Sequence, residues 1–220
     1  MTAAASTGLV LRSPEGTRYL FDPGALCLEL LTTGGPGPLA RHEVLHAPED
    51  LSRWLALSRL GVGPGDVRVS PGELAAARRL RDALWRLARA AAGGGPWGPG
   101  DLAEVNRAAA APPLAPCIGA DRTRVWQLPA DGTGALSTVA RDAVDLFTGP
   151  LAGRIRECAA HDCFLVFVDA SRPGRRRWCA MERCGTRSKT RALRARRATG
   201  GTAAPAGPAS EDTADGRTGP

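Results

Sequence analysis

The sequence feature that most constrains the fold is a set of four cysteines arranged as two close pairs. The first pair flanks the letters AAHD, the second flanks AMER, and fifteen residues separate the two pairs. Paired loops of this kind let four thiolates converge on one tetrahedral Zn²⁺, each at about 2.3 Å from the metal. We therefore predict a structural zinc site whose ligands are Cys158, Cys163, Cys179 and Cys184.

The residues around these cysteines predict a small domain that folds around the metal. Residues 164–169 predict a strand, a turn containing Pro and Gly follows, and residues 175–179 predict the second strand of a hairpin. Beyond Gly185 no helix breaker occurs before Gly200, so this stretch predicts a helix. A piece of this size cannot bury a self-sufficient core without a metal. The order of loop, hairpin, loop and helix therefore indicates a treble-clef-like zinc finger.

Other interpretations of the cysteines stay open from the sequence. The two pairs are also compatible with two disulfides or with an ordinary core, and His161 is an alternative ligand in place of one cysteine. Disulfides are rare in a reducing cytoplasm, which favours the metal. Cys27 and Cys117 stand alone among apolar residues, and we predict that both are buried.

The first residues of the chain and its hydropathy indicate a cytoplasmic protein. The N-terminus lacks the basic start and apolar run of a secretory signal. No stretch approaches the roughly 18 apolar residues that a membrane span needs. We therefore expect no membrane partner.

The excess positive charge lies in the same stretch as the paired cysteines. The whole chain has a net charge of +7, while residues 154–197 hold thirteen basic and four acidic residues. Residues 1–153 are neutral, and residues 198–220 are slightly acidic and lack large apolar residues, which predicts a disordered tail. A bias toward arginine throughout the chain would have spread this excess. The charge therefore indicates an anionic partner for residues 154–197.

Residues 1–153 predict a mainly α-helical domain with minor β structure. The segment 70–95 shows the strongest helical pattern, with apolar residues at steps of three and four from Leu74 to Ala91 and with Gly93 as the stop. Weaker patterns predict a helix from Pro48 that stops at Gly61, a helix after Asp101 and a helix from Leu136 towards Gly149. We divide the chain into residues 1–153, a zinc finger at 154–197 and a tail at 198–220.

The C-terminal stretch resembles the CGNR zinc finger family. The resemblance rests on the paired cysteines, the turn FVDASR, the entry RRWC and the exit CGTRSK, and it covers residues 154–197. Patterns such as LCLELLTT and DLSRWL make the N-terminal part similar to the ABATE domain, which precedes this finger in bacterial stress-responsive transcription regulators. Threonine stands at position 186 where the family's name-giving motif has asparagine, and at position 32 where the family tends to have asparagine.

A rigid zinc module with this charge predicts a nucleic-acid-binding surface, with duplex DNA favoured over RNA. Arginine binds phosphate oxygens in a bidentate manner and also reaches guanine edges. The resemblance implies a cytoplasmic, nucleoid-associated transcription regulator, with the N-terminal domain as sensor or dimerisation part. It leaves the effector unknown and a homodimer open. The candidate contacts are Arg172, Arg175, Arg176, Arg177, Arg187, Lys189, Arg191, Arg194, Arg196 and Arg197.

Two alternatives to a DNA-binding regulator remain at this stage. The basic helix is also compatible with a solvated surface, or with a zinc-held structural module that docks a protein or RNA. In addition, His42, Glu43 and His46 spell HEVLH, the H-E-x-x-H motif of zinc metallopeptidases. Prolines at 38 and 48 leave little room for the helix that this motif requires, so we expect no enzyme.

Overall fold

The longest helix of the described chain, α3 (Pro71–Gly93), runs through the centre of the fold. It begins with a capping box, because Ser70 Oγ accepts a hydrogen bond from the Glu73 N–H and the Glu73 carboxylate accepts one from the Ser70 N–H. It ends at Gly93 and is followed by Gly94, whose φ of 71° lies in the left-handed region that favours glycine. The sequence predicts this helix and its end at Gly93.

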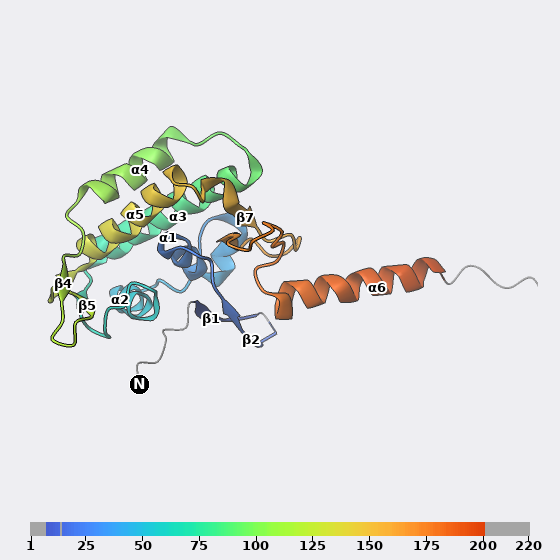
Figure 1. Ribbon diagram of the computed structural model, residues 1–220, viewed down its shortest axis with the longest axis horizontal. Helices are drawn as coiled ribbons and strands as arrows, with labels where there is room; N and C mark the ends of the chain where they lie inside the picture. Colours follow the sequence, from blue (N-terminus) through green and yellow to red (C-terminus); the bar gives the residue numbers. More distant parts are fainter. Residues whose placement is uncertain (1–7, 14, 201–220) are drawn as a thin grey trace, which may run out of the picture.

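The computed structural model describes residues 8–13 and 15–200, with side chains up to residue 197. Figure 1 shows packed helices from which the last helix extends away. The α-helices are α1 (Leu26–Leu30), α2 (Pro48–Leu57), α3, α4 (Pro99–Ala110), α5 (Gly132–Thr148) and α6 (Thr186–Gly200). The short 3-10 or π turns are η1 (Leu31–Thr33), η2 (Gly37–His42), η3 (Ala152–Arg154) and η4 (Met181–Gly185).

The strands form four separate pairs and no large sheet within the described residues. Three pairs are antiparallel, and the pair β3–β6 is parallel. They are β1 (Leu9–Arg12) with β2 (Arg18–Phe21), β3 (Val67–Arg68) with β6 (Ala130–Asp131), β4 (Pro116–Ile118) with β5 (Arg124–Trp126), and β7 (Ile155–Glu157) with β8 (Val166–Val168). The structure thus confirms a mainly helical N-terminal part with minor strands.

The main core lies where α3 meets its neighbours. Apolar side chains of α3 such as Leu80, Leu84 and Leu87 are buried together with Val139 and Ala143 of α5. The helices α1, α2 and α4 also contact α3, and β7 packs against it (Figure 1). Fully burying one such leucine contributes about 1.5–3 kcal/mol, so this cluster supplies most of the stabilising contacts of the body.

The hairpin of the C-terminal stretch differs from the predicted one. Strand β8 lies within the predicted 164–169, but it pairs with β7, and residues 175–179 form no strand. The Asp169 carboxylate explains the difference, because it accepts hydrogen bonds from the N–H groups of Ser171 and Arg176 and so turns the chain away from β8. The Arg177 carbonyl then accepts a hydrogen bond from the Ala159 N–H at 2.9 Å, so this segment lies against the first cysteine loop.

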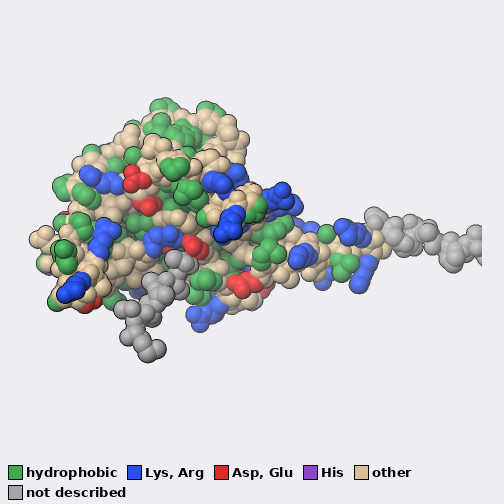
Figure 2. Space-filling model, viewed as in Figure 1, with side chains coloured by type: hydrophobic (Ala, Val, Ile, Leu, Met, Phe, Trp, Pro, Cys, Tyr) green, Lys and Arg blue, Asp and Glu red, His purple; other side chains and the backbone are tan. Residues whose placement is uncertain are grey.

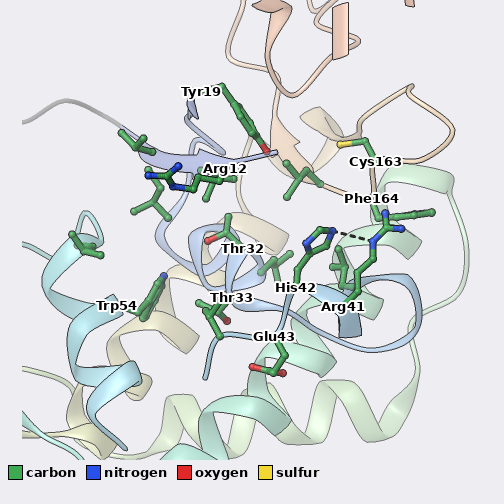
Figure 3. A pocket seen from close by; sticks show the side chains of 18 of the residues that line it. Arg12, Tyr19, Thr32, Thr33, Arg41, His42, Glu43, Trp54, Cys163 and Phe164 are labelled. Atoms are coloured by element: carbon green, nitrogen blue, oxygen red, sulfur yellow. Dashed lines mark hydrogen bonds between the residues drawn. The ribbon is translucent and has the colours of Figure 1, made fainter. Parts of the chain in front are cut away.

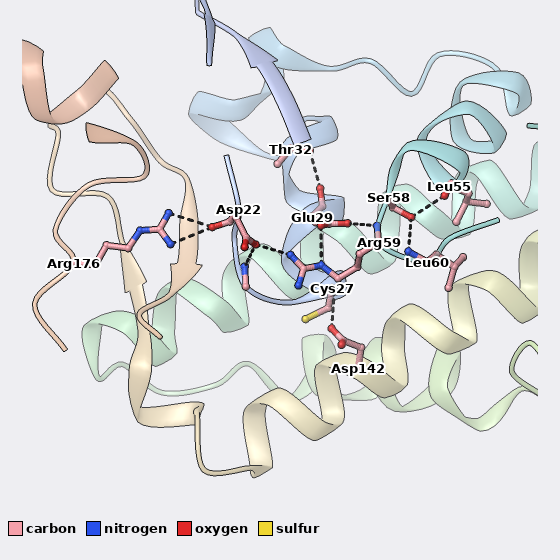
Figure 4. Close-up of polar contacts among 11 residues, drawn as sticks. Asp22, Cys27, Glu29, Thr32, Leu55, Ser58, Arg59, Leu60, Asp142 and Arg176 are labelled. Carbon is pink, nitrogen blue, oxygen red and sulfur yellow. Dashed lines mark hydrogen bonds and ion pairs between the residues drawn. The ribbon is translucent and has the colours of Figure 1, made fainter. Parts of the chain in front are cut away.

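Three smaller expectations are corrected. Helix α2 ends at Leu57 and not at Gly61, because the Glu29 carboxylate accepts the Arg59 N–H and Ser58 Oγ accepts the Leu60 N–H (Figure 4). Cys117 is exposed on β4, whereas Cys27 is buried as predicted. Helix α6 continues to Gly200, past the start of the predicted tail, and the rest of that tail at 201–220 lies outside the described residues.

No helix in the described part of the chain combines the length and apolar character of a membrane span.

Candidate metal centre and basic helix

The four paired cysteines come together at the junction of two loops and the start of α6. The first loop joins β7 to β8, and it is closed by hydrogen bonds from the Cys158 N–H to the Leu165 carbonyl and from the Cys163 N–H to the Ala160 carbonyl. Cys184 lies in the π-helical turn η4, directly before α6. Local hydrogen bonds therefore hold three of these cysteines in place before any metal is considered.

The spacing of the sulfur atoms fits a tetrahedral metal ion. All four Sγ atoms lie within 4.8 Å of one another, and all four residues are buried. The Sγ atom of Cys179 lies 3.7 Å from that of Cys163 and 3.5 Å from that of Cys184. Four sulfurs at about 2.3 Å from one zinc would be separated by about 3.8 Å. The cluster is therefore of the size that Zn²⁺ requires.

The charge state of the cluster also favours a cation. The hydrogen bonds donated by Cys163 and then by Cys179 hold the pKa of the Cys158 thiol well below its ordinary value. The same hydrogen bonds raise the pKa of Cys163 and of Cys179, because each of these thiols donates its proton to the Cys158 sulfur. The N–H of Cys179 also lies 3.4 Å from the Cys158 sulfur, as a donor to a thiolate. Cysteine thiolates are the ligands that Zn²⁺ takes in sites of this kind.

A second, smaller core surrounds the cysteines and includes the N-terminal hairpin. Tyr19 and Phe21 of β2 are buried with the four cysteines and with Phe167 of β8. The carboxylate of Glu182 accepts the Leu20 N–H at 3.1 Å. Sequence reasoning missed this contribution, although the alternation of Tyr19 and Phe21 with exposed neighbours is the pattern of a strand with one buried face. Residues from 1–153 and from 154–197 thus share one core.

Arg176 is a packing residue of this region and not an exposed basic group. Its guanidinium donates hydrogen bonds to the backbone carbonyl of Asp22 (Figure 4) and to those of Trp178 and Cys179. It also stacks on the ring of Phe167. Those partners engage all three nitrogens of the guanidinium, so Arg176 joins the finger to the segment at Asp22, and its contact with nucleic acid stays a prediction. Asp22 links Arg176 to the helical body. Its carboxylate forms an ion pair with Arg59, and Arg59 forms a second ion pair with Glu29 of α1 (Figure 4).

The other basic residues lie on the surface of the finger and on α6. Arg187 is half-buried and forms an ion pair with Asp162. Arg191 is exposed and donates to the Nδ1 atom of His161, so His161 faces α6 and does not join the cysteine cluster. The remaining candidates are exposed: Arg172, Arg175, Arg177, Lys189, Arg194, Arg196 and Arg197. Figure 2 shows lysine and arginine side chains along α6.

Comparison with known families agrees with this arrangement. Residues 24–150 match ABATE, described as "Putative stress-induced transcription regulator", which covers more than half of the chain. The chain belongs to the ABATE family. Residues 154–197 match the CGNR zinc finger, as the sequence predicts. No curated protein matches the chain. The ABATE match begins after the β1–β2 hairpin, so the strands that complete the finger's core lie outside both matched regions.

Thr186 takes a structural role at the position where CGNR fingers have asparagine. Its Oγ1 donates a hydrogen bond of 3.0 Å to the Met181 carbonyl and so closes the turn η4 that carries Cys184. Thr32, in the ABATE part, similarly donates from Oγ1 to the Glu29 carbonyl at 2.7 Å. Both threonines thus satisfy carbonyls at helix ends.

The HEVLH motif of the ABATE part does not have the geometry of a metallopeptidase. His42 ends the 3-10 turn η2, and residues 43–47 are not helical, so the two histidines do not lie one turn apart on a helix. The Glu43 carboxylate forms an ion pair of 2.8 Å with the buried Arg81. Among the described residues, the metal-ligand groups found contain neither histidine.

Proposed function

We propose that this ABATE–CGNR protein is a zinc-dependent transcription regulator that binds duplex DNA through α6 and the adjacent arginines. The observation that carries the proposal is α6 itself. It has six basic residues and no acidic one, it is exposed from Lys189 to Arg197, and it starts two residues after Cys184 (Figure 1). Zinc bound by the four cysteines would fix the direction of this helix relative to the body.

The exposure of α6 favours the proposal that this helix binds a large partner. An isolated helix of this length is marginal in water, because most helical stability in proteins comes from packing an apolar face. From Lys189 to Arg197 every residue of this helix is exposed, and the helix extends away from the packed body (Figure 1). A polyanion that neutralises the arginines would stabilise it, and arginine forks match phosphate geometry.

A groove beside α6 adds a second set of arginines. It has a volume of about 590 Å³ and lies between the turn of the β1–β2 hairpin and the first half of α6. Arg18 of the hairpin and Arg187, Arg191 and Arg194 of α6 line it, together with Glu15 and Glu182. Arg18 was not among the residues that sequence reasoning selected. The arginines on both sides of this groove favour binding of a phosphate backbone between the hairpin and the helix.

The test is the salt dependence of binding to labelled duplex DNA and to duplex RNA of the same sequence. On duplex DNA each phosphate contact contributes about 0.9 to the slope of log K against log salt. We expect the double variant Lys189→Gln/Arg194→Gln to bind more weakly and to lower this slope by about 2. The matched control is Arg68→Gln/Arg122→Gln, which removes two exposed arginines of the body and should leave the slope unchanged.

Two results would contradict the proposal. Absence of salt-sensitive binding to either nucleic acid near about 50 mM salt would reject it, because phosphate contacts are strongest there. Tighter binding to RNA than to DNA would reject the DNA preference and favour an RNA-interaction module.

A further inference from the structure

A large cavity lies between the ABATE helices, the N-terminal hairpin and the finger. Its volume is about 910 Å³, which is in the range of small-molecule sites. Strand β1, the segment 31–33, helix α2 and the loop around Cys163 all contribute to its wall (Figure 3). No described residue of α6 lines this cavity, although Arg18 and Arg183 lie at the edge of both this cavity and the groove beside α6.

One part of the wall is apolar and uncovered. Val10 of β1, Val44 of the segment before α2, and Leu57 at the end of α2 line the cavity, and they are 56%, 51% and 67% exposed. Leu31 and Trp54 lie deeper in the same wall. Exposed apolar side chains gathered in one concavity are typical of ligand sites, because the ligand's apolar part covers them.

The other part of the wall is cationic. The acidic residues of the lining are Glu43, Asp50 and Asp162, and each of them is already paired with an arginine. Four lining arginines form no ion pair within the described part of the chain: Arg12, Arg18, Arg41 and Arg183. On the finger side, Arg41 reaches the carbonyl of Asp162 at 3.4 Å. The cavity therefore has an excess of positive charge facing an apolar wall.

Unsatisfied donors are concentrated in the same cavity. Three buried side-chain N–H groups lack a hydrogen-bond partner in the described residues, and two of them, Trp54 Nε1 and Arg183 Nε, belong to lining residues. His42 also lines the cavity, and its Nε2 accepts from Arg41 at 3.1 Å, which leaves Nδ1 as the donor of the neutral ring (Figure 3). Buried donors without acceptors are costly, and an anion with oxygen acceptors would relieve that cost.

We infer that this cavity binds an organic monocarboxylate with an apolar body, the carboxylate lying towards Arg41 and Arg183 and the apolar body against Val10, Val44 and Leu57. Such a ligand would touch the ABATE part and the finger at once, because the lining includes Trp54 on one side and Cys163 and Arg183 on the other. The inference stands independently of nucleic-acid binding.

The test uses the zinc-loaded full chain and the fluorescent amphipathic anion 8-anilinonaphthalene-1-sulfonate as probe. Octanoate should displace the probe at a concentration at least about tenfold lower than octanol or octylamine, because one charge-assisted hydrogen bond corresponds to about this factor. Octanoate should also slow the transfer of zinc to a chelator, since the ligand joins the finger to the body. Neither readout involves DNA.

Two surface variants locate the site. Arg41→Gln should weaken octanoate binding about tenfold, and Leu57→Asp should abolish it, because the new charge repels the carboxylate and the apolar contact is lost. The matched controls are Arg68→Gln and Ile118→Asp, which change an exposed arginine and an apolar residue that is 86% exposed, both away from the cavity lining. Displacement by octanol as effective as that by octanoate would overturn the inference. So would variants that bind octanoate like their controls.

Discussion

The guanidinium of Arg183 lies over the ring of Tyr19, 4.8 Å from its centroid, and donates a 2.7 Å hydrogen bond to the tyrosine hydroxyl. Tyr19 comes from the N-terminal hairpin, and Arg183 lies between the last two cysteines of the finger. Burial raises the pKa of Tyr19 well above its ordinary value, so the hydroxyl stays protonated and accepts this bond. Residues far apart in sequence thus complete the finger's core.

The first prediction concerns this contact. Tyr19→Ala should lower the free energy of unfolding of the zinc-loaded chain by about 3 kcal/mol, because a large buried side chain is removed. Tyr19→Phe, which loses only the hydrogen bond, should cost about 1 kcal/mol. Leu20→Ala is the matched control, since Leu20 lies next to Tyr19 but is 48% exposed. Urea denaturation measures all three, and equal effects of Tyr19→Ala and Leu20→Ala would contradict the shared core.

The second prediction separates Arg176 from its neighbour. Arg176→Met should lower the free energy of unfolding by about 2 kcal/mol, because the carbonyls of Asp22, Trp178 and Cys179 lose a charged donor. Arg175→Met, at an exposed position, should leave stability within about 0.5 kcal/mol of the wild type. Thermal or urea unfolding gives the comparison. A larger loss for Arg175→Met would show that the assigned role of Arg176 is wrong.

The third prediction concerns metal content. One zinc per chain should be bound, and it should be lost in the double variant Cys158→Ala/Cys179→Ala but retained in His42→Ala. Because α3 and α5 pack in the main core, the zinc-free chain should keep most of its helical circular dichroism while the finger loses its structure. Atomic absorption and far-ultraviolet circular dichroism measure these quantities. Two zinc ions per chain would revive a metal role for HEVLH.

The fourth prediction concerns acid stability. Burial alone would raise the pKa of the Glu43 carboxyl, but hydrogen bonds from Arg81 and from the Leu45 N–H outweigh it and hold the pKa below its ordinary value of 4.5. A carboxyl whose pKa is lower in the folded state stabilises the fold above its unfolded pKa, and this contribution disappears as the pH falls through the folded pKa.

Glu43→Gln should therefore lower the free energy of unfolding at pH 7 by about 2 kcal/mol. The difference from the wild type should shrink below about pH 4 and should not grow there, since the wild-type carboxyl is then becoming protonated. Glu49→Gln serves as the control, because Glu49 is exposed on α2. Urea denaturation at several pH values measures the effect, and a pH-independent difference would exclude this ion pair as its cause.

Several elements follow from local sequence. The helix predicted within 70–95 is confirmed, with its end at Gly93, because Ser70, Pro71, Glu73 and Gly94 each act on the backbone within one turn. The clustering of the four cysteines also follows from local sequence, because each pair is separated by a short loop that brings its two sulfurs together. The predicted end of α2 at Gly61 is wrong, since Glu29, distant in sequence, captures the Arg59 N–H.

Strand pairing and the role of Arg176 required the tertiary structure. Strand β8 has two candidate partners, residues 155–157 and 175–179, and the Asp169 carboxylate selects the first by turning the chain. Sequence charge alone groups Arg176 with Arg175 and Arg177. Only the surrounding carbonyls and the ring of Phe167 distinguish a packing arginine from exposed ones.

The sequence by itself determined the helical class of the body, the four-cysteine cluster and the placement of charge at 154–197, because these depend on residue spacing and composition. The tertiary structure decided that strands β1 and β2 complete the finger and that α6 projects from the body. It also decided that a cavity lies between the ABATE part and the finger, lined by arginines that form no ion pair among the described residues. These features arise from contacts between residues more than a hundred positions apart, which no local pattern encodes.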